Sequence, residues 1–265
     1  MWDYHIHTKR CGHARGEMEQ YVEEALKKGL RAIAFTDHVP MYFRRPDPSI
    51  AMAHGDLEKY VKDVLSLKDR YPEIKIALGL EVDYIPGKEE KLERVLEPYP
   101  WDYLLGSIHW IGDWGFDNPE LISEYRKRDL VEIYREYYNL LKGAAASGLF
   151  DSLAHPDLIK KLGFRIAPDV EVALIMEVLE VVSLNQVCLE ASTAGWRYPA
   201  NEQYPSKAFL KLAFEKGISV TLGSDAHAPE QVGLDFLRIM GLLKEIGYKE
   251  VATFYRRMKK MEGLD

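Results

Sequence analysis

The chain has 265 residues, of which 35 are basic and 42 acidic, so its formal net charge is −7, and 47% of its residues are apolar. These values are typical of a soluble globular protein and exclude a mainly disordered, collagen-like or coiled-coil chain. The acidic balance argues against a broad nucleic-acid-binding surface. No uninterrupted apolar run approaches the roughly 18 residues that a membrane-spanning helix needs.

The two cysteines, Cys11 and Cys188, are too few for a disulfide framework, and the first segment is charged and rich in histidine. We therefore expect a cytoplasmic protein without a signal peptide. The length fits one α/β barrel of about 250 residues, so we expect a single domain over residues 1–265. The sequence leaves the oligomeric state open, a homo-oligomer included.

Short apolar runs alternate with amphipathic helical patterns along the chain. The apolar runs cover residues 4–7, 32–36, 74–82, 103–109, 149–154, 186–189 and 218–223. The helical patterns cover residues 17–28, 56–70, 88–96, 129–146, 168–183, 206–215 and 229–246. This alternation indicates parallel βαβ units, in an open doubly wound sheet or in a closed barrel. In both folds, ligands bind beyond the carboxyl ends of the strands.

Histidines and carboxylates follow almost every apolar run, and seven of the eight histidines fall at these positions. Alternation along a strand points His5 and His7 to the same face. One histidine at a strand end is usually a hydrogen-bonded structural residue, but separate structural roles do not explain why so many share one end of the sheet. Imidazole is the commonest metal ligand, and these donors outnumber the four of one tetrahedral zinc. The pattern therefore predicts two or three metal ions that share bridging groups.

Six ordered motifs resemble those of the PHP (polymerase and histidinol phosphatase) superfamily. They are His5-Ile6-His7, Thr36-Asp37-His38, Gly79-Leu80-Glu81, Gly106-Ser107-Ile108-His109, Ala154-His155-Pro156 and Gly223-Ser224-Asp225-Ala226-His227. The resemblance extends from residue 5 to about residue 233 and implies a distorted (β/α)7 barrel with a metal cluster at the C-terminal rim of the strands.

The same resemblance implies a site with three divalent metal ions and assigns nine residues to them. The first ion is expected at His5, His7, Glu81 and Asp225, the second at Glu81, His109 and His155, and the third at His13, His38 and His227. Among these residues, Glu81, Asp225 and His227 are expected to take part in catalysis. Imidazole and carboxylate ligands suit zinc, iron and manganese alike, so the identities of the metals stay open.

The segment Ser192-Thr193-Ala194-Gly195-Trp196-Arg197 resembles the region after the sixth strand in the histidinol-phosphatase branch, where an arginine contacts the substrate phosphate. We therefore expect Arg197 and Ser192 to bind substrate, although Ser192 stands where that branch often has asparagine.

Further substrate contacts are expected in two predicted loops on the same rim. Lys160, Lys161 and Arg165 follow His155, and His54 lies in a long loop, residues 39–55, that is expected to cover the substrate. The alternative for Lys160, Lys161 and Arg165 is a solvated basic loop without a substrate contact. The alternative for His54 is a local hydrogen bond. Trp110, beside His109, is expected either in the pocket wall or in the core.

The resemblance implies a metal-dependent phosphomonoesterase that hydrolyses L-histidinol phosphate to L-histidinol and phosphate in histidine biosynthesis. One alternative is a phosphoesterase of the same family that acts on a nucleotide, a sugar phosphate or phosphotyrosine. The other is a metal-binding module without catalysis. The expected partner is a small phosphomonoester rather than a nucleic acid or a membrane.

Overall fold

Parallel strands form the centre of the computed structural model, which describes residues 1–264. Within that range the main sheet has seven strands: β1 (Trp2–Ile6), β2 (Ala32–Phe35), β3 (Lys75–Asp83), β4 (Tyr103–Ser107), β7 (Ser152–Leu153), β8 (Cys188–Ser192) and β9 (Val220–Gly223). Neighbours in this order are hydrogen-bonded, and Ile6 also pairs with Ala226 beyond β9. The sheet is thereby nearly closed, which confirms the distorted (β/α)7 barrel.

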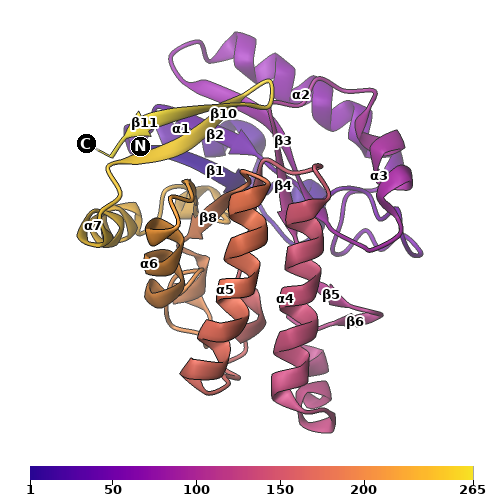
Figure 1. Cartoon of the computed structure of the whole chain (residues 1–265). Helices are drawn as coiled ribbons and strands as arrows, with labels where there is room; N and C mark the ends of the chain where they lie inside the picture. The colour runs from indigo at the N-terminus through magenta and orange to yellow at the C-terminus, as the bar shows by residue number, and fades with distance from the viewer. Residues whose placement is uncertain (265) are drawn as a thin grey trace.

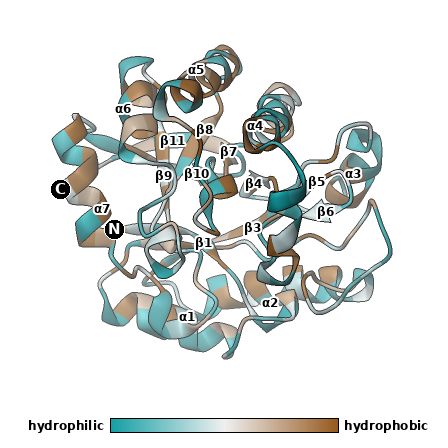
Figure 2. Cartoon of the chain, turned by 90° about the horizontal axis from the view of Figure 1, so that it is seen from below, coloured by the Kyte–Doolittle hydropathy of each residue, from teal (hydrophilic) through white to brown (hydrophobic). Residues whose placement is uncertain are grey.

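The helices lie outside the ring of strands (Figure 2). They are α1 (Met18–Lys27), α2 (Leu57–Arg70), α3 (Glu89–Leu96), α4 (Leu130–Ala146), α5 (Pro168–Leu184), α6 (Lys207–Glu215) and α7 (Phe236–Ile246). Short 3-10 turns occupy Lys9–Cys11, His54–Asp56, Pro119–Lys127, Leu158–Lys160, Ala194–Arg197 and Pro229–Gln231. Helices α4, α5 and α6 stand side by side (Figure 1). Among residues 1–264, no helix combines the length and the hydropathy needed to cross a membrane.

The sequence predicts six of these helices to within one residue at each end, but it places the start of α7 too early. The expected helix over 229–246 begins only at Phe236. Pro229–Gln231 forms a separate turn, and Asp235 has a φ of 61°, a left-handed conformation that interrupts a right-handed helix.

Two antiparallel hairpins were not predicted. The first, β5 (Trp110–Ile111) with β6 (Trp114–Gly115), follows β4 at the end of the barrel where the predicted ligands lie. The second, β10 (Glu250–Tyr255) with β11 (Met258–Gly263), follows α7 and lies across the upper end of the molecule in Figure 1.

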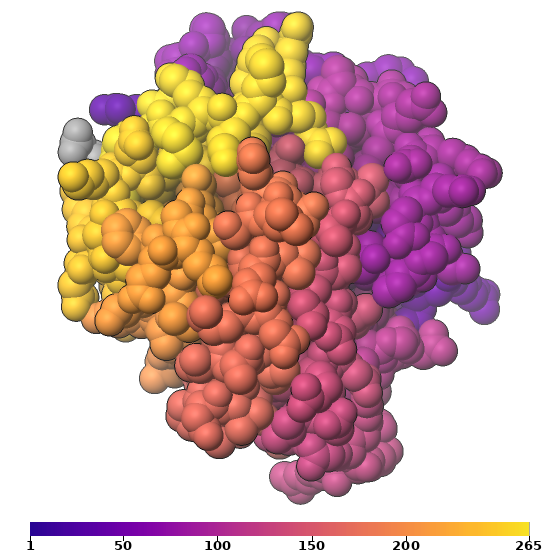
Figure 3. All heavy atoms as spheres, viewed as in Figure 1, coloured from indigo at the N-terminus to yellow at the C-terminus, as the bar shows by residue number. Residues whose placement is uncertain are grey.

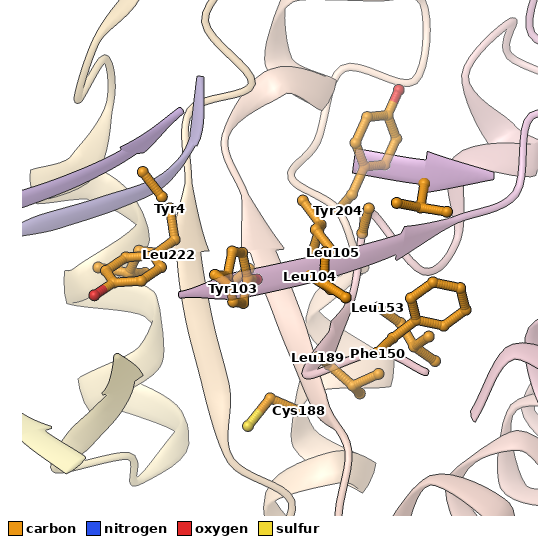
Figure 4. Packing of buried hydrophobic residues seen from close by; sticks show 14 of the residues in the cluster. Tyr4, Tyr103, Leu104, Leu105, Phe150, Leu153, Cys188, Leu189, Tyr204 and Leu222 are labelled. Carbon is orange, nitrogen blue, oxygen red and sulfur yellow. The ribbon is translucent and has the colours of Figure 1, made fainter. Parts of the chain in front are cut away.

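Hairpin β10–β11 closes the N-terminal end of the barrel. The Tyr4 hydroxyl donates to the carbonyl oxygen of Phe254 at 3.1 Å, and Arg257 pairs with Asp151, just before β7, at 2.6 Å. Tyr103 packs edge-on against Tyr4, with ring centroids 5.2 Å apart (Figure 4). The ring centroid of Tyr103 also lies 5.1 Å from that of Phe254. The space-filling view shows the C-terminal segment spread over this end of the molecule (Figure 3). The opposite, C-terminal end of the strands is therefore the end left for a site.

The buried carboxylate of Asp102 joins this hairpin to the barrel. It accepts hydrogen bonds from the backbone N–H of Leu78 at 2.9 Å and of Arg256 at 3.1 Å, and it pairs with Lys68 of α2. One side chain thus ties together a central strand, a helix and the last hairpin.

We predict that Asp102→Ala lowers the free energy of unfolding by about 3 kcal/mol, because two backbone N–H groups and an ammonium group lose their acceptor. Urea unfolding followed by circular dichroism measures the change. Asp69→Ala, an exposed position on α2, is the control and should stay within about 0.5 kcal/mol of the parent. Equal effects of the two substitutions would contradict this role of Asp102.

Candidate metal centre

The nine residues assigned to metals lie together at the C-terminal ends of the strands. His5 and Glu81 belong to β1 and β3, and the others follow directly after a strand or lie in the loop beyond it. Those others are His7, His13, His38, His109, His155, Asp225 and His227. Each strand delivers its polar residue to this rim because parallel strands all end on the same side of the barrel.

A first group of donors surrounds one point between β1, β3 and the end of β9. His5 Nε2 and His7 Nε2 lie 3.2 and 3.3 Å from Glu81 Oε2 and 3.6 and 3.3 Å from Asp225 Oδ1. Zinc–ligand bonds of about 2.0–2.1 Å at tetrahedral angles place neighbouring donor atoms about 3.3 Å apart. The four side chains therefore have the spacing of one cation's coordination shell.

The second oxygen of Glu81 faces a different pair of histidines. Glu81 Oε1 lies 2.9 Å from His155 Nε2 and 3.6 Å from His109 Nε2. Burial favours the neutral carboxyl, but the imidazoles of His5, His38 and His109 outweigh burial and hold the pKa of Glu81 well below its ordinary value. An anionic carboxylate with its two oxygens turned to separate groups is suited to bridge two cations.

A third group forms around His13 and His227, whose Nε2 atoms are 2.9 Å apart. The Nδ1 atoms of both rings face backbone carbonyl oxygens, of Cys11 at 2.9 Å and of Asp225 at 3.1 Å. Donation from Nδ1 leaves Nε2 as the nitrogen with the lone pair in a neutral ring. Two lone pairs at this distance repel each other unless a cation lies between them.

His38 lies near members of the first, second and third groups rather than only with the third. Its Nδ1 is 3.2 Å from Glu81 Oε2. A His38 nitrogen also lies within 4.8 Å of ring nitrogens of His7 and His227. The sequence assigned His38 to the third ion alone, whereas the structure also places it beside candidate ligands of the other ions.

Two carboxylates outside the assigned set orient the ligand imidazoles. Glu190 accepts from His5 Nδ1 at 2.7 Å, and its other oxygen accepts from the backbone N–H of His155 at 2.7 Å. Asp83 accepts from His109 Nδ1 at 2.9 Å. These contacts fix the proton on Nδ1 and turn Nε2 of both rings towards the cluster.

Gly223 leaves the space that the Glu190 carboxylate occupies. A Cβ at this position would lie 1.9 Å from Glu190 Oε1 and 2.7 Å from the His5 Cβ. Neither Glu190 nor Asp83 was assigned a role from the sequence. Asp83 follows Glu81 by two residues on β3 and so lies on the same strand face, a signal that identifies it.

The backbone is strained at two of the assigned ligands. His155 has a φ of 28° and Asp225 a φ of 51°. Such left-handed conformations cost of order 1–3 kcal/mol for residues other than glycine, and they concentrate at functional sites.

A cavity of about 700 Å³ opens beside the cluster, within the range of small-molecule sites. Seven of the nine assigned residues line it: His13, His38, Glu81, His109, His155, Asp225 and His227. Phe43, Trp110 and Tyr198 add aromatic walls, and Phe43 belongs to the long second loop, as expected. Among the proposed substrate contacts, Lys161 reaches the cavity and pairs there with Asp117 at 2.8 Å. Burial lowers the pKa of Lys161, but Asp117 outweighs burial and raises it above its ordinary value.

Arg197 lies next to the cluster. Its Nη2 donates to the carbonyl oxygens of Ser224 at 2.7 Å and Asp225 at 3.0 Å. Its Nη1 is buried and has no hydrogen-bond partner within residues 1–264. A buried cationic donor without an acceptor is costly, so this nitrogen is suited to an anionic ligand.

Arg197 itself does not line the cavity, and neither do the four remaining proposed substrate contacts in the described part of the chain; the predictions for these four are corrected. Lys160 is completely buried and pairs with Asp157 at 2.6 Å and Glu202 at 2.9 Å. Arg165 also pairs with Glu202, at 2.6 Å. The Ser192 hydroxyl accepts from the backbone N–H of Ala194 at 3.3 Å, and His54 Nε2 donates to the Met41 carbonyl oxygen at 2.9 Å. Local hydrogen bonds and ion pairs account for all four.

Known proteins resemble this chain over nearly its whole length. A probable histidinol-phosphatase from Deinococcus radiodurans is 42% identical over 258 residues, which cover 97% of this chain and 98% of the relative. A histidinol-phosphatase from Bacillus subtilis is 31% identical over 259 residues, which cover 87% and 95%. The crystal structure of histidinol phosphate phosphatase from Lactococcus lactis, complexed with zinc, L-histidinol and phosphate, matches with a TM-score of 0.85 at 25% identity over 98% of both chains.

The family model of the PHP domain matches residues 3–194, which include the first five of the six motifs. The match confirms the resemblance drawn from the motifs. The chain belongs to the PHP domain family.

Proposed function

We propose that the chain is a metal-dependent histidinol-phosphatase, which hydrolyses L-histidinol phosphate to L-histidinol and phosphate. The observation that carries the proposal is the convergence of seven imidazoles with Glu81 and Asp225 beside a cavity of about 700 Å³. Relatives with the name histidinol-phosphatase match almost the full length of the chain, and one related structure contains L-histidinol and phosphate.

The donor set fits three divalent cations, drawn from zinc, iron and manganese. We assign the first to His5, His7, Glu81 and Asp225, and the second to Glu81, His109 and His155. The third belongs to His13 and His227, with His38 between it and the second. When bound, the cations supply positive charge that attracts a phosphate monoester and Lewis acidity that activates water.

The chain's own residues bind and orient the substrate around these cations. Arg197 Nη1 donates to a phosphate oxygen, which gives this buried nitrogen the acceptor it lacks within residues 1–264. Lys161 adds a second positive charge in the cavity wall. Phe43, Trp110 and Tyr198 enclose the organic part of the substrate and exclude water from it. Glu190 and Asp83 hold the protons on His5 Nδ1 and His109 Nδ1.

The substrate is tested by phosphate release from L-histidinol phosphate beside a nucleotide monophosphate, a sugar phosphate and phosphotyrosine, with bound metals quantified in the same preparation. We expect kcat/KM for L-histidinol phosphate to exceed the others by roughly 100-fold or more, with activity lost on chelation and restored by metal. Similar rates on all four would retain the phosphatase chemistry and discard this substrate. A fully metal-loaded protein that releases no phosphate would support the non-catalytic alternative.

His227→Ala removes one of the two nitrogens that face each other in the third group. We expect the variant to lose one metal equivalent and nearly all turnover while the barrel stays folded, because Glu81 and the first group are untouched. Elemental analysis, a steady-state assay and circular dichroism measure these three properties. His54→Ala, which removes the histidine outside the cluster, should keep its full metal content. Full metal content and activity in His227→Ala would contradict the third site.

Arg197→Ala tests the phosphate contact. We expect KM for L-histidinol phosphate to rise roughly tenfold or more, because a charged hydrogen bond to the phosphate is lost. Metal content should be unchanged, since the arginine contacts backbone oxygens and not ligand atoms. An unchanged KM with reduced metal content would instead assign Arg197 to the support of Asp225.

A further inference from the structure

The sulfur of Cys11 lies inside the ligand cluster. Cys11 is completely buried at the end of the turn Lys9–Cys11. Its Sγ and one ring nitrogen each of His13 and His227 all lie within 4.8 Å of one another. The sulfur forms a second such group with a ring nitrogen of His7 and a carboxylate oxygen of Asp37. The Cys11 sulfur therefore lies among the potential ligand atoms.

A rigid turn places this sulfur. Asp37 accepts from the backbone N–H of Thr8 at 2.7 Å and from its hydroxyl at 2.6 Å, and the Cys11 N–H donates to the Thr8 carbonyl oxygen at 3.0 Å. Gly12 continues the turn with a φ of 86°, and a Cβ there would lie 2.1 Å from the Pro48 carbonyl oxygen. Only glycine fits this position, and the turn it permits presents Cys11 and His13 to the same space.

The third group is short of donors without the sulfur. A catalytic zinc takes three protein ligands and keeps a fourth position for water or substrate. His13 and His227 contribute one Nε2 each, whereas His38 also faces Glu81 and His109. A thiolate beside His13 and His227 supplies a further donor at the point where donors are few.

A buried imidazole beside Cys11 gives independent support. His7 is completely buried, and its Nε2 faces His5, Glu81 and Asp225. Its other nitrogen, Nδ1, has no hydrogen-bond partner among residues 1–264. A neutral imidazole that binds a metal through Nε2 carries its proton on Nδ1. A thiolate sulfur held nearby gives that N–H an acceptor.

We propose that Cys11 is a thiolate ligand of the third metal ion and that its sulfur makes this position select zinc over manganese. The metal–sulfur bond replaces the S–H bond, and the proton leaves to solvent. Thiolates are soft ligands that favour zinc, whereas manganese favours oxygen donors. The inference rests on the proposed metal centre, and it is independent of which phosphomonoester the enzyme hydrolyses.

Cobalt substitution tests the sulfur–metal bond directly. Co²⁺ replaces zinc in such sites, and a thiolate bound to it gives a near-ultraviolet charge-transfer absorption that imidazole and carboxylate ligands do not give. We expect this absorption in the cobalt-loaded parent and in Cys188→Ala, and its loss in Cys11→Ser. Cys188 is the matched control, since it is a buried cysteine within the hydrophobic core (Figure 4).

Metal selectivity gives the second readout. After dialysis against equal concentrations of Zn²⁺ and Mn²⁺, the ratio of bound zinc to manganese should fall roughly tenfold or more in Cys11→Ser and stay unchanged in Cys188→Ala. Cobalt bound by the parent without charge-transfer absorption would overturn the assignment of Cys11 and leave the metal centre intact. A parent that binds no cobalt, zinc or manganese would overturn both.

Discussion

The rest of the site depends on the contacts that the Glu81 carboxylate makes. Its two oxygens lie within 3.6 Å of nitrogens of five histidines, His5, His7, His38, His109 and His155. These histidines come from four different strand ends, and the carboxylate is 1% exposed. A buried anion requires positive partners, and its two oxygens join the first donor group, the second donor group and His38. Asp225 has the same character, since burial disfavours its charge but His5, His7 and His227 hold its pKa well below the ordinary value.

The barrel separates packing from chemistry along its axis. At the N-terminal end, Tyr4 and Tyr103 pack together, and Tyr103 packs against Phe254 of hairpin β10–β11. At the C-terminal end, polar residues take over and the backbone bends into left-handed conformations at His155 and Asp225. Packing at the N-terminal end stabilises the fold and so offsets the free-energy cost of the strained backbone at the C-terminal end. In the proposed function, bound cations, Lys161 and Arg197 would attract an anionic substrate to this rim although the chain as a whole is acidic.

Much of the fold follows from sequence patterns because the strands are short, buried and regularly spaced. The helices outside them have continuous amphipathic patterns, so their bounds are predicted closely, except where Asp235 interrupts α7. The clustering of the candidate ligands was predictable because parallel strands deliver their end residues to one rim. The pairing of Lys160 with Asp157 and Glu202 was not predictable, since Glu202 lies some forty residues further along the chain. The last hairpin was also missed, because half of the residues in its second strand, Met258–Gly263, are charged and the strand is largely exposed.

We propose that nine side chains from six strand ends hold three cations in one cluster. Anomalous X-ray diffraction at the absorption edge of the metal found in the purified protein tests this claim most directly. We expect three anomalous peaks, one beside each donor group, with Glu81 next to more than one of them. A metal-loaded crystal with a single peak, or with peaks away from Glu81, would contradict it.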